Sequence, residues 1–408
     1  MRSSGRTVVI GGGAAGIAAA RTLHDAGREV LLIEAADRLG GRARSVTLPT
    51  GHVVDHGCGW LHSAKRNPWT AIAERAGFTV DRRSPNWQVQ WNDLGFPPEE
   101  KRASGEAYAR FEEAAMAALD GPDYPLSDFV DSRDAWRPMI DAISGYANGA
   151  SLTEVSLRDW AAYENAATDD NWAVVEGYGT VVSHHAAGLA IRTGVTATRV
   201  NHGGRTVHIE TSHGTIKADH VIIAVPTTVL AEGKLTFDPP LPDKHAAAAA
   251  LPLGIADKVF LSVEGPLPWP AHAHLTGNPH SACTASHRLS PFGWPIVESF
   301  FGGPCAEMLE EDGAAAAFAI DELVALLGSD WRSRFIPLDA TRWRHVTLIG
   351  GSYSHAKIGH AGARGTLAEP VDDRLFFAGE ACSREDFSTA HGAFETGVKA
   401  ANSILARR

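Results

Sequence analysis

The sequence predicts an α/β protein in which a discontinuous domain, built on a parallel sheet, is interrupted by segments of a second domain. Its N-terminal residues alternate strand, glycine-rich loop, helix and strand, which is the opening of a βαβ unit. Another strand and helix close the chain, and the residues between differ in character from both ends. Because 408 residues exceed what one small core needs, we expect two domains of ordinary size.

The N-terminal unit consists of short apolar runs separated by glycine. Thr7–Ile10 and Val30–Ile33 have strand length and carry no charge, which predicts two buried strands. Between them, residues 14–26 are rich in alanine at helical spacing, and Gly27 follows as a stop signal.

The rest of the chain changes its pattern several times. The patterns predict mostly helices over 69–172, strands over 190–225 with a hairpin turn at 202–205, a strand over 256–263, a helix near 313–327, a strand over 375–378 and a helix over 392–405. The strand and helix at the C-terminus are expected to join the N-terminal unit, with the intervening segments forming the second domain.

Composition and charge narrow the class of protein. The net charge is −11, and a diffuse acidic balance argues against a nucleic-acid partner. No run approaches the roughly 18 apolar residues that span a bilayer, so we expect no membrane segment. The oligomeric state is not determined by these features.

The cysteines bear on the cellular compartment. There are four, Cys58, Cys283, Cys305 and Cys382, and none forms a CxxC pair. This spacing argues against a zinc site, so no metal is predicted. We expect reduced thiols and a cytoplasmic protein.

The loop at residues 11–16, GGGAAG, fits the pattern GxGxxG between a strand and a helix. In that pattern Gly11 permits the tight turn, Gly13 lets the backbone approach a pyrophosphate, and Gly16 lets helix and strand pack closely. The helix start, near Ala15, then faces the phosphates. Glu34 ends the second strand, where an acid accepts hydrogen bonds from a ribose. An ordinary glycine turn is the alternative.

Gly40, Gly41 and Arg42 follow Glu34 closely. A glycine pair before an arginine allows another close backbone approach and adds a guanidinium for a phosphate. A surface turn with a solvated arginine explains these three residues equally well.

The whole run 8–42, VVIGGGAAGIAAARTLHDAGREVLLIEAADRLGGR, resembles the N-terminus of the flavin-dependent amine oxidases. This superfamily includes monoamine oxidases, polyamine oxidases and histone lysine demethylases. The resemblance implies a glutathione-reductase-type FAD-binding domain over 1–61, 177–253 and 356–408. It also implies a substrate-binding domain of mixed sheet plus helices over 62–176 and 254–355.

Further segments carry the same resemblance. They are residues 54–62 with Asn67-Pro68, Gly194-Val195, 224–228, 253–258, 342–354, 377–380 and 388–393. The stretch Trp60-Leu61-His62 is most similar to the polyamine and spermine oxidases. The helical middle of the chain is not matched.

The resemblance assigns residues to two groups. It implies that FAD is bound by Gly11, Gly13, Ala15, Gly16, Glu34, Gly41, Arg42, Gly59, Trp60, Val195, Gly379, Glu380, Thr389, Ala390 and His391. It places Lys258, Trp60, His62, Trp343 and Tyr353 at the catalytic cavity, where the family's lysine holds a water next to flavin N5. A solvent-facing edge lysine, a core tryptophan and a hydrogen-bonded structural histidine are the alternatives for Lys258, Trp343 and His62.

The sequence also departs from its relatives. Monoamine oxidases attach FAD through a cysteine where this chain has Ser352, so non-covalent FAD is expected. They carry a tyrosine where this chain has Thr389, so a two-tyrosine cage is not expected. No long helical insertion is evident, which argues against a histone demethylase.

The activity that the resemblance implies is FAD-dependent oxidation of an amine C–N bond, with O2 reduced to H2O2 and the imine hydrolysed. A polyamine or secondary amine is the favoured small-molecule substrate. Asp169, Asp170 and Glu176 are the candidate carboxylates for a polycation, although a solvated loop explains them as well. The alternatives are a flavin-dependent desaturase or dehydrogenase of the same superfamily, and a non-catalytic flavin-binding subunit.

Overall fold

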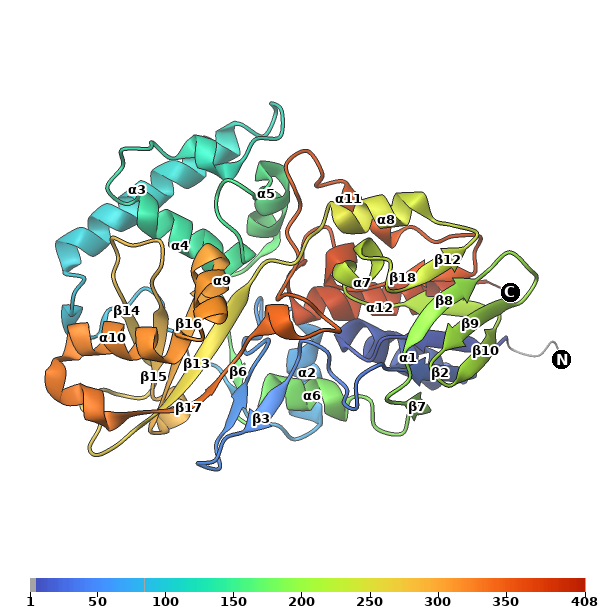
Figure 1. The fold of residues 1–408 in the computed structure, drawn as a ribbon, viewed down its shortest axis with the longest axis horizontal. Helices are drawn as coiled ribbons and strands as arrows, with labels where there is room; N and C mark the ends of the chain where they lie inside the picture. The colour runs from blue at the N-terminus through green and yellow to red at the C-terminus, as the bar shows by residue number, and fades with distance from the viewer. Residues whose placement is uncertain (1–4, 84, 408) are drawn as a thin grey trace.

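The computed structural model describes residues 5–83 and 85–407. Two groups of elements lie side by side in Figure 1, one around a parallel sheet near both termini and one around an antiparallel sheet. The predicted α/β class, with one discontinuous domain and a second domain of sheet plus helices, is confirmed.

The parallel sheet assembles strands from distant parts of the chain. Its order is β18 (Leu375–Phe377), β11 (His220–Ile223), β1 (Thr7–Ile10), β2 (Val30–Ile33) and β7 (Ile191–Arg192). Every residue of β1 and β2 is buried, as expected for a parallel strand covered on both faces.

Two helices pack together over one face of this sheet. They are α1 (Ala14–Asp25) and α12 (Ala390–Leu405). A Cβ at Gly397 would lie 2.1 Å from the Ala15 carbonyl oxygen, so the close contact of the two helices requires glycine there. The N-terminal and C-terminal parts of the chain therefore share one core, as the sequence predicts.

A smaller sheet covers the other face. Its order is β10 (Gly214–Ala218), β9 (Val207–Thr211), β8 (Ala197–Asn201) and β12 (Thr236–Asp238). The predicted turn at 202–205 joins β8 to β9, which pair antiparallel. The helices of this part are α7 (Thr227–Ala231), α8 (Pro242–Ala249) and α11 (Ala363–Ala368).

The antiparallel sheet belongs to the other group of elements. Its order is β14 (Ala273–Thr276), β15 (Ser286–Leu289), β16 (Ile296–Gly302), β13 (Ala256–Val263) and β17 (Phe335–Ala340). One face packs on α9 (Gly303–Asp312) and α10 (Ala315–Leu327). The other face is more polar and includes Lys258.

The region predicted to be mostly helical contains α2 (Pro68–Arg75), α3 (Pro98–Ala117), α4 (Arg137–Asn148) and α5 (Leu157–Ala166). The prediction is wrong for residues 76–83 and 85–97, which form turns, a short 3₁₀ helix and β5 (Val80–Asp81). β5 pairs with β6 (Ala173–Val174), a partner far away in sequence that a local pattern does not reveal. The remaining elements are β3 (Ser45–Thr47), β4 (Val53–Asp55) and α6 (Tyr178–His184).

The expectation of four reduced thiols is wrong for one pair. Cys283 and Cys305 form a disulfide that joins the loop before β15 to α9, whereas Cys58 and Cys382 are free. The two partners are brought together by the packing of α9 on the sheet, so their spacing in sequence is uninformative.

In the part of the chain that the structure describes, no helix has the length and apolar character that crossing a membrane requires.

Candidate active site

A cavity of about 1340 Å³ lies between the glycine-rich loop and the antiparallel sheet. This volume exceeds the range of about 300–1,000 Å³ that is typical for one small-molecule site. Among the residues predicted to form the site, all line the cavity except Gly16 and His391. The cavity is therefore large enough for a dinucleotide and a second small molecule together.

The glycine-rich loop shapes one end of the cavity. Gly11 has a φ of 106°, and a Cβ there would lie 2.4 Å from the Ala224 carbonyl oxygen. A Cβ at Gly13 would meet no protein atom closer than 4.0 Å, so this backbone borders open cavity. Helix α1 begins at Ala14 without a side-chain cap, which leaves its first N–H groups for a ligand.

Gly16 has a packing role rather than a lining one. A Cβ at this position would lie 1.9 Å from the Gly11 carbonyl oxygen. Glycine here thus lets α1 start directly on the loop, as the GxGxxG pattern predicts.

Glu34 stands at the end of β2, beside the loop. Its carboxylate accepts hydrogen bonds from the Gly12 N–H at 2.5 Å and the Ala36 N–H at 2.8 Å. The Val195 N–H donates to the Glu34 carbonyl oxygen at 2.9 Å, which places Val195 at the same end of the cavity. A carboxylate has about four acceptor sites, so Glu34 can still accept from ribose hydroxyls.

Arg42 and Glu380 form an ion pair across 338 residues of sequence, with 2.9 Å between Nη1 and Oε1. Ser354 Oγ donates to the other oxygen of Glu380 at 2.6 Å, and Ser354 in turn accepts from buried Arg364. Burial acts to raise the pKa of Glu380, but Arg42 and Arg364 outweigh it and hold that pKa below its usual value. The carboxylate is ionised and orients Arg42, whose remaining N–H groups are available to a phosphate.

The start of α12 forms the wall next to this ion pair. Gly379 has a φ of 147° and no atom within 4 Å of an added Cβ, and it lines the cavity. Thr389 caps α12 by accepting from the Gly392 N–H at 3.0 Å.

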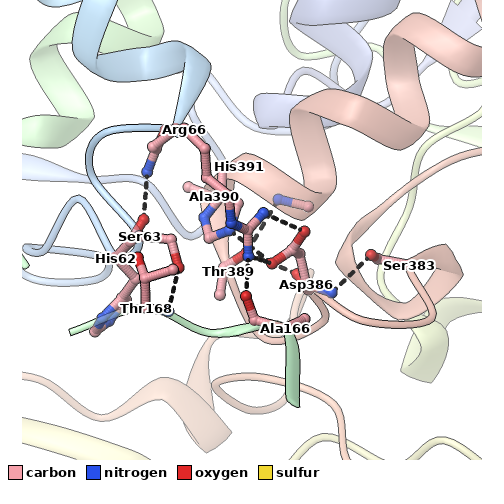
Figure 2. Close-up of polar contacts among 12 residues, drawn as sticks. His62, Ser63, Arg66, Ala166, Thr168, Ser383, Asp386, Thr389, Ala390 and His391 are labelled. Atoms are coloured by element: carbon pink, nitrogen blue, oxygen red, sulfur yellow. Dashed lines mark hydrogen bonds and ion pairs between the residues drawn. The ribbon is translucent and has the colours of Figure 1, made fainter. Parts of the chain in front are cut away.

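A polar cluster behind this wall holds the helix start in place (Figure 2). Asp386 accepts from Arg66 Nη1 at 2.8 Å and contacts His391 Nε2 at 3.0 Å, while Arg66 also donates to the Ala166 carbonyl oxygen. His391 is thus buried against Asp386 rather than lining the cavity. Ala390 does line it, so the backbone of the helix start is the part that faces a ligand.

The polar face of the antiparallel sheet forms the floor of the cavity. Alternate residues of four strands line it, as expected because side chains alternate between the two faces of a sheet. They are Ala256 and Lys258 on β13, Glu298 and Phe300 on β16, Ser286 and Arg288 on β15, and His274 and Thr276 on β14. We call this set the polar floor.

Lys258 is buried in the polar floor, with a side chain that is 8% exposed. Its Nζ lies 2.9 Å from Glu298 Oε1 and donates to the Asp55 carbonyl oxygen at 2.9 Å. An added Cβ at Gly59 would lie 3.2 Å from this Nζ, so glycine makes room for the lysine. The solvent-facing alternative for Lys258 is thus excluded, and one of its three N–H groups is left for a water or a substrate.

Two of the predicted aromatic residues are fixed by hydrogen bonds to backbone. The Trp343 indole N–H donates to the His56 carbonyl oxygen at 3.1 Å, and the Tyr353 hydroxyl donates to the Tyr146 carbonyl oxygen. Both side chains line the cavity with little rotational freedom.

Trp60 and His62 also line the cavity. Trp60 meets Trp87 edge to face, with 5.2 Å between ring centroids. His62 Nδ1 lies 2.6 Å from Asn171 Oδ1, and burial lowers the pKa of His62 to about 4. The ring is therefore neutral near pH 7, and donation from Nδ1 leaves Nε2 as an acceptor.

The predicted carboxylates for a polycation are not at the cavity. Asp170 accepts from the Lys65 N–H and Glu176 from the Thr79 N–H, and neither these two nor Asp169 lines the cavity. Among the described residues of α3, α5 and the antiparallel sheet, the acids that line the cavity are Glu164 and Glu298. Sequence analysis missed Glu298 because a lone acid in an apolar strand carries no local signal.

The residues at the glycine-loop end fit a dinucleotide cofactor such as FAD. The open positions at Gly13 and Gly379, the uncapped start of α1 and the oriented Arg42 together offer a backbone cradle and a cation for phosphates. Glu34 is placed to bind a ribose.

Comparisons with known proteins identify the family. The sequence signature of the family described as flavin containing amine oxidoreductase matches residues 14–119 and 126–405. The chain is 31% identical over 440 residues to polyamine oxidase 2 of Arabidopsis thaliana, covering 98% of this chain and 88% of that protein. It is 26% identical to lysine-specific histone demethylase 1B of Mus musculus, covering 98% of this chain and 52% of the relative.

One solved structure shows the same fold. It is a putrescine oxidase redesigned in its cofactor binding, with a TM-score of 0.79, 19% identity and 99% coverage of both chains.

Proposed function

The chain belongs to the flavin-containing amine oxidoreductases, and from this premise we propose that it oxidises a secondary amine or a polyamine, with O2 as electron acceptor. It is an FAD-dependent enzyme. The observation that supports the proposal is a single cavity that joins the dinucleotide cradle to the polar floor carrying Lys258.

Bound FAD would accept a hydride from the carbon next to the amine nitrogen and pass two electrons to O2, giving H2O2, while water hydrolyses the iminium to a carbonyl compound and an amine. The protein's own groups bind and orient the reactants. Lys258 holds a water at the floor through its remaining N–H group. Neutral His62 offers Nε2 as an acceptor for the substrate nitrogen.

The aromatic residues shape the space around the substrate. Trp60, Trp343 and Tyr353 enclose the cavity with large apolar surfaces and exclude bulk water.

The division of the chain into two domains at 61/62, 176/177, 253/254 and 355/356 stays a prediction. So does the cytoplasmic location, which the Cys283–Cys305 disulfide argues against.

An amine panel tests the proposed function. We expect spermidine, N-acetylspermidine or a cyclic secondary amine to show a higher kcat/KM than benzylamine, measured as H2O2 release under air. A clear preference for benzylamine would contradict the secondary-amine and polyamine assignment. If no amine bleaches the flavin under anaerobic conditions, amine oxidation itself is wrong and a flavin desaturase becomes the better description.

Non-covalent attachment of FAD is expected from the position of Ser352. Its hydroxyl donates to the Ala256 carbonyl oxygen at 2.8 Å and accepts from the Ala256 N–H at 2.8 Å, so it joins β13 to the loop before Ser354. No thioether can form at this residue. Acid precipitation should release all of the yellow colour into the supernatant, whereas flavin fluorescence that stays with the protein band on a denaturing gel would refute the expectation.

A further inference from the structure

Arg288 in the polar floor lacks a full set of hydrogen-bond partners. Its side chain is 11% exposed and lines the cavity. Nη2 lies 3.0 Å from His272 Nδ1, and Nη1 lies 3.6 Å from Glu298 Oε2, which exceeds hydrogen-bond length. Nε is buried without any partner. A guanidinium with unsatisfied donors at a cavity wall is suited to bind an acceptor that enters the cavity.

Glu298 cannot satisfy Arg288 alone, because Lys258 uses the same carboxylate. Lys258 Nζ lies 2.9 Å from Glu298, closer than Arg288 does. Two buried cations therefore share one anion, and a buried charge with incomplete pairing is costly. Burial lowers the pKa of Arg288, and Glu298 and Asp81 oppose that shift.

Among the residues that the structure describes, no further anion is in contact with Arg288. His272 lies between Arg288 and Asp81, with 3.0 Å between His272 Nε2 and Asp81 Oδ2. Burial first, and then Arg288 and Arg83, lower the pKa of His272 to about 4, so its ring is neutral near pH 7. Two aromatic rings contact the guanidinium instead. Its central carbon, Cζ, lies 4.4 Å from the centroid of the Trp60 ring and 5.0 Å from that of Phe292.

The substrate side of the cavity as a whole carries more cations than anions. Among the described residues of α3, α5 and the antiparallel sheet, the charged side chains that line it are Lys101, Arg102, Lys258, Arg288, Glu164 and Glu298. Burial raises the pKa of Glu164 to about 7, which reduces the negative charge further. A small molecule with several positive charges would be repelled from this side of the cavity, whereas a molecule with an anionic group would be attracted to it.

We propose that Arg288 binds a carboxylate on the substrate, so that the amine oxidised here is a compact secondary amine that also carries a carboxylate. The inference rests on the proposed amine oxidation and narrows its substrate class. A planar guanidinium binds a carboxylate through N–H···O hydrogen bonds. Nη1 of Arg288, which lies 3.6 Å from Glu298 and has no partner within hydrogen-bond length, is the donor that we assign to the substrate carboxylate. The substrate is compact because Arg288 and Lys258 contact the same Glu298.

Matched pairs of amines test the proposal. We compare proline with pyrrolidine, and 4-(methylamino)butanoate with N-methylbutylamine, since each pair differs in the carboxylate. In the wild-type enzyme kcat/KM should be at least about tenfold higher for the carboxylated member of at least one pair, which corresponds to roughly 1.4 kcal/mol. Arg288→Met should abolish this preference, mainly through KM, and Arg288→Lys should retain part of it. Arg332→Met, at an exposed arginine paired with Asp321, should leave it unchanged.

A second measurement covers the case in which Arg288→Met does not fold. Butanoate added to the wild-type holoenzyme should perturb the flavin absorbance spectrum and compete with the amine. The absence of both effects, together with equal kcat/KM within each pair, would overturn the proposal. If spermidine exceeds all carboxylated amines, this proposal is wrong while the proposed function stands. If no amine reduces the flavin, the proposed function itself fails.

Discussion

Replacing Lys258 by methionine is expected to slow flavin reduction or reoxidation at least about tenfold, roughly 1.4 kcal/mol of barrier, while FAD stays bound. Methionine keeps the length of the side chain and removes the charge and all three N–H donors. The hydrogen bond to the Asp55 carbonyl oxygen and the ion pair with Glu298 are lost together. The water that we assign to the third N–H group loses its donor as well.

The two half-reactions are measured separately by anaerobic reduction with an amine and by mixing the reduced enzyme with O2. Lys244→Met is a matched control, because Lys244 is also buried and donates to the carbonyl oxygens of Thr366, Leu367 and Glu369, away from the cavity. This control should lower the melting temperature and leave the rates of the folded enzyme unchanged. Wild-type rates for both half-reactions in Lys258→Met would eliminate the assigned role.

Replacing Gly16 by alanine is expected to weaken FAD binding at least about tenfold. The added Cβ would lie 1.9 Å from the Gly11 carbonyl oxygen, a distance that backbone atoms cannot tolerate, so the loop must move away from the helix start. Such overpacking costs typically about 1–3 kcal/mol. Because Ala14 and Ala15 line the cavity at this point, the movement changes the position of the N–H groups that face the cofactor.

FAD content per chain and the dissociation constant of FAD from the apoprotein are the measurements. Gly362→Ala is the control, since Gly362 has a φ of −65° and no atom within 4 Å of an added Cβ. Alanine fits this backbone conformation without a clash, so it should leave FAD binding unchanged, at a cost of no more than about 1 kcal/mol for the poorer N-cap of α11. If Gly16→Ala bound FAD as tightly as the wild type and melted at the same temperature, the packing argument for this glycine would be wrong.

The dinucleotide half of the site could be predicted from local sequence because it is built from local signals. Strand, glycine loop, helix and acid follow one another within residues 7–34, and each element needs only its neighbours to be recognised. The structure places β1, α1 and β2 within one residue of the predicted bounds. Phe377 to Glu380 at the other end of the chain is a comparable local pattern.

The pairing of charges in the polar floor could not be predicted in the same way. Lys258, Arg288 and Glu298 come from three strands of the antiparallel sheet, and only the pairing register places Arg288 directly opposite Glu298. A register shift of one residue would turn these side chains to the other face. Asp169, Asp170 and Glu176, for which a solvated loop was the alternative, do not line the cavity either, and only the packing of the chain decides this.

The sequence by itself therefore determined the α/β class and the cofactor cradle, because glycine spacing and apolar strands act over short distances. The choice of Lys258 came from the resemblance to the amine oxidases. Tertiary structure alone decided which charged side chains line the cavity. It paired Arg42 with Glu380, joined Cys283 to Cys305 and left Arg288 incompletely paired beside Lys258. Contacts of this kind depend on how separate strands and helices pack, and short-range sequence patterns carry no record of that packing.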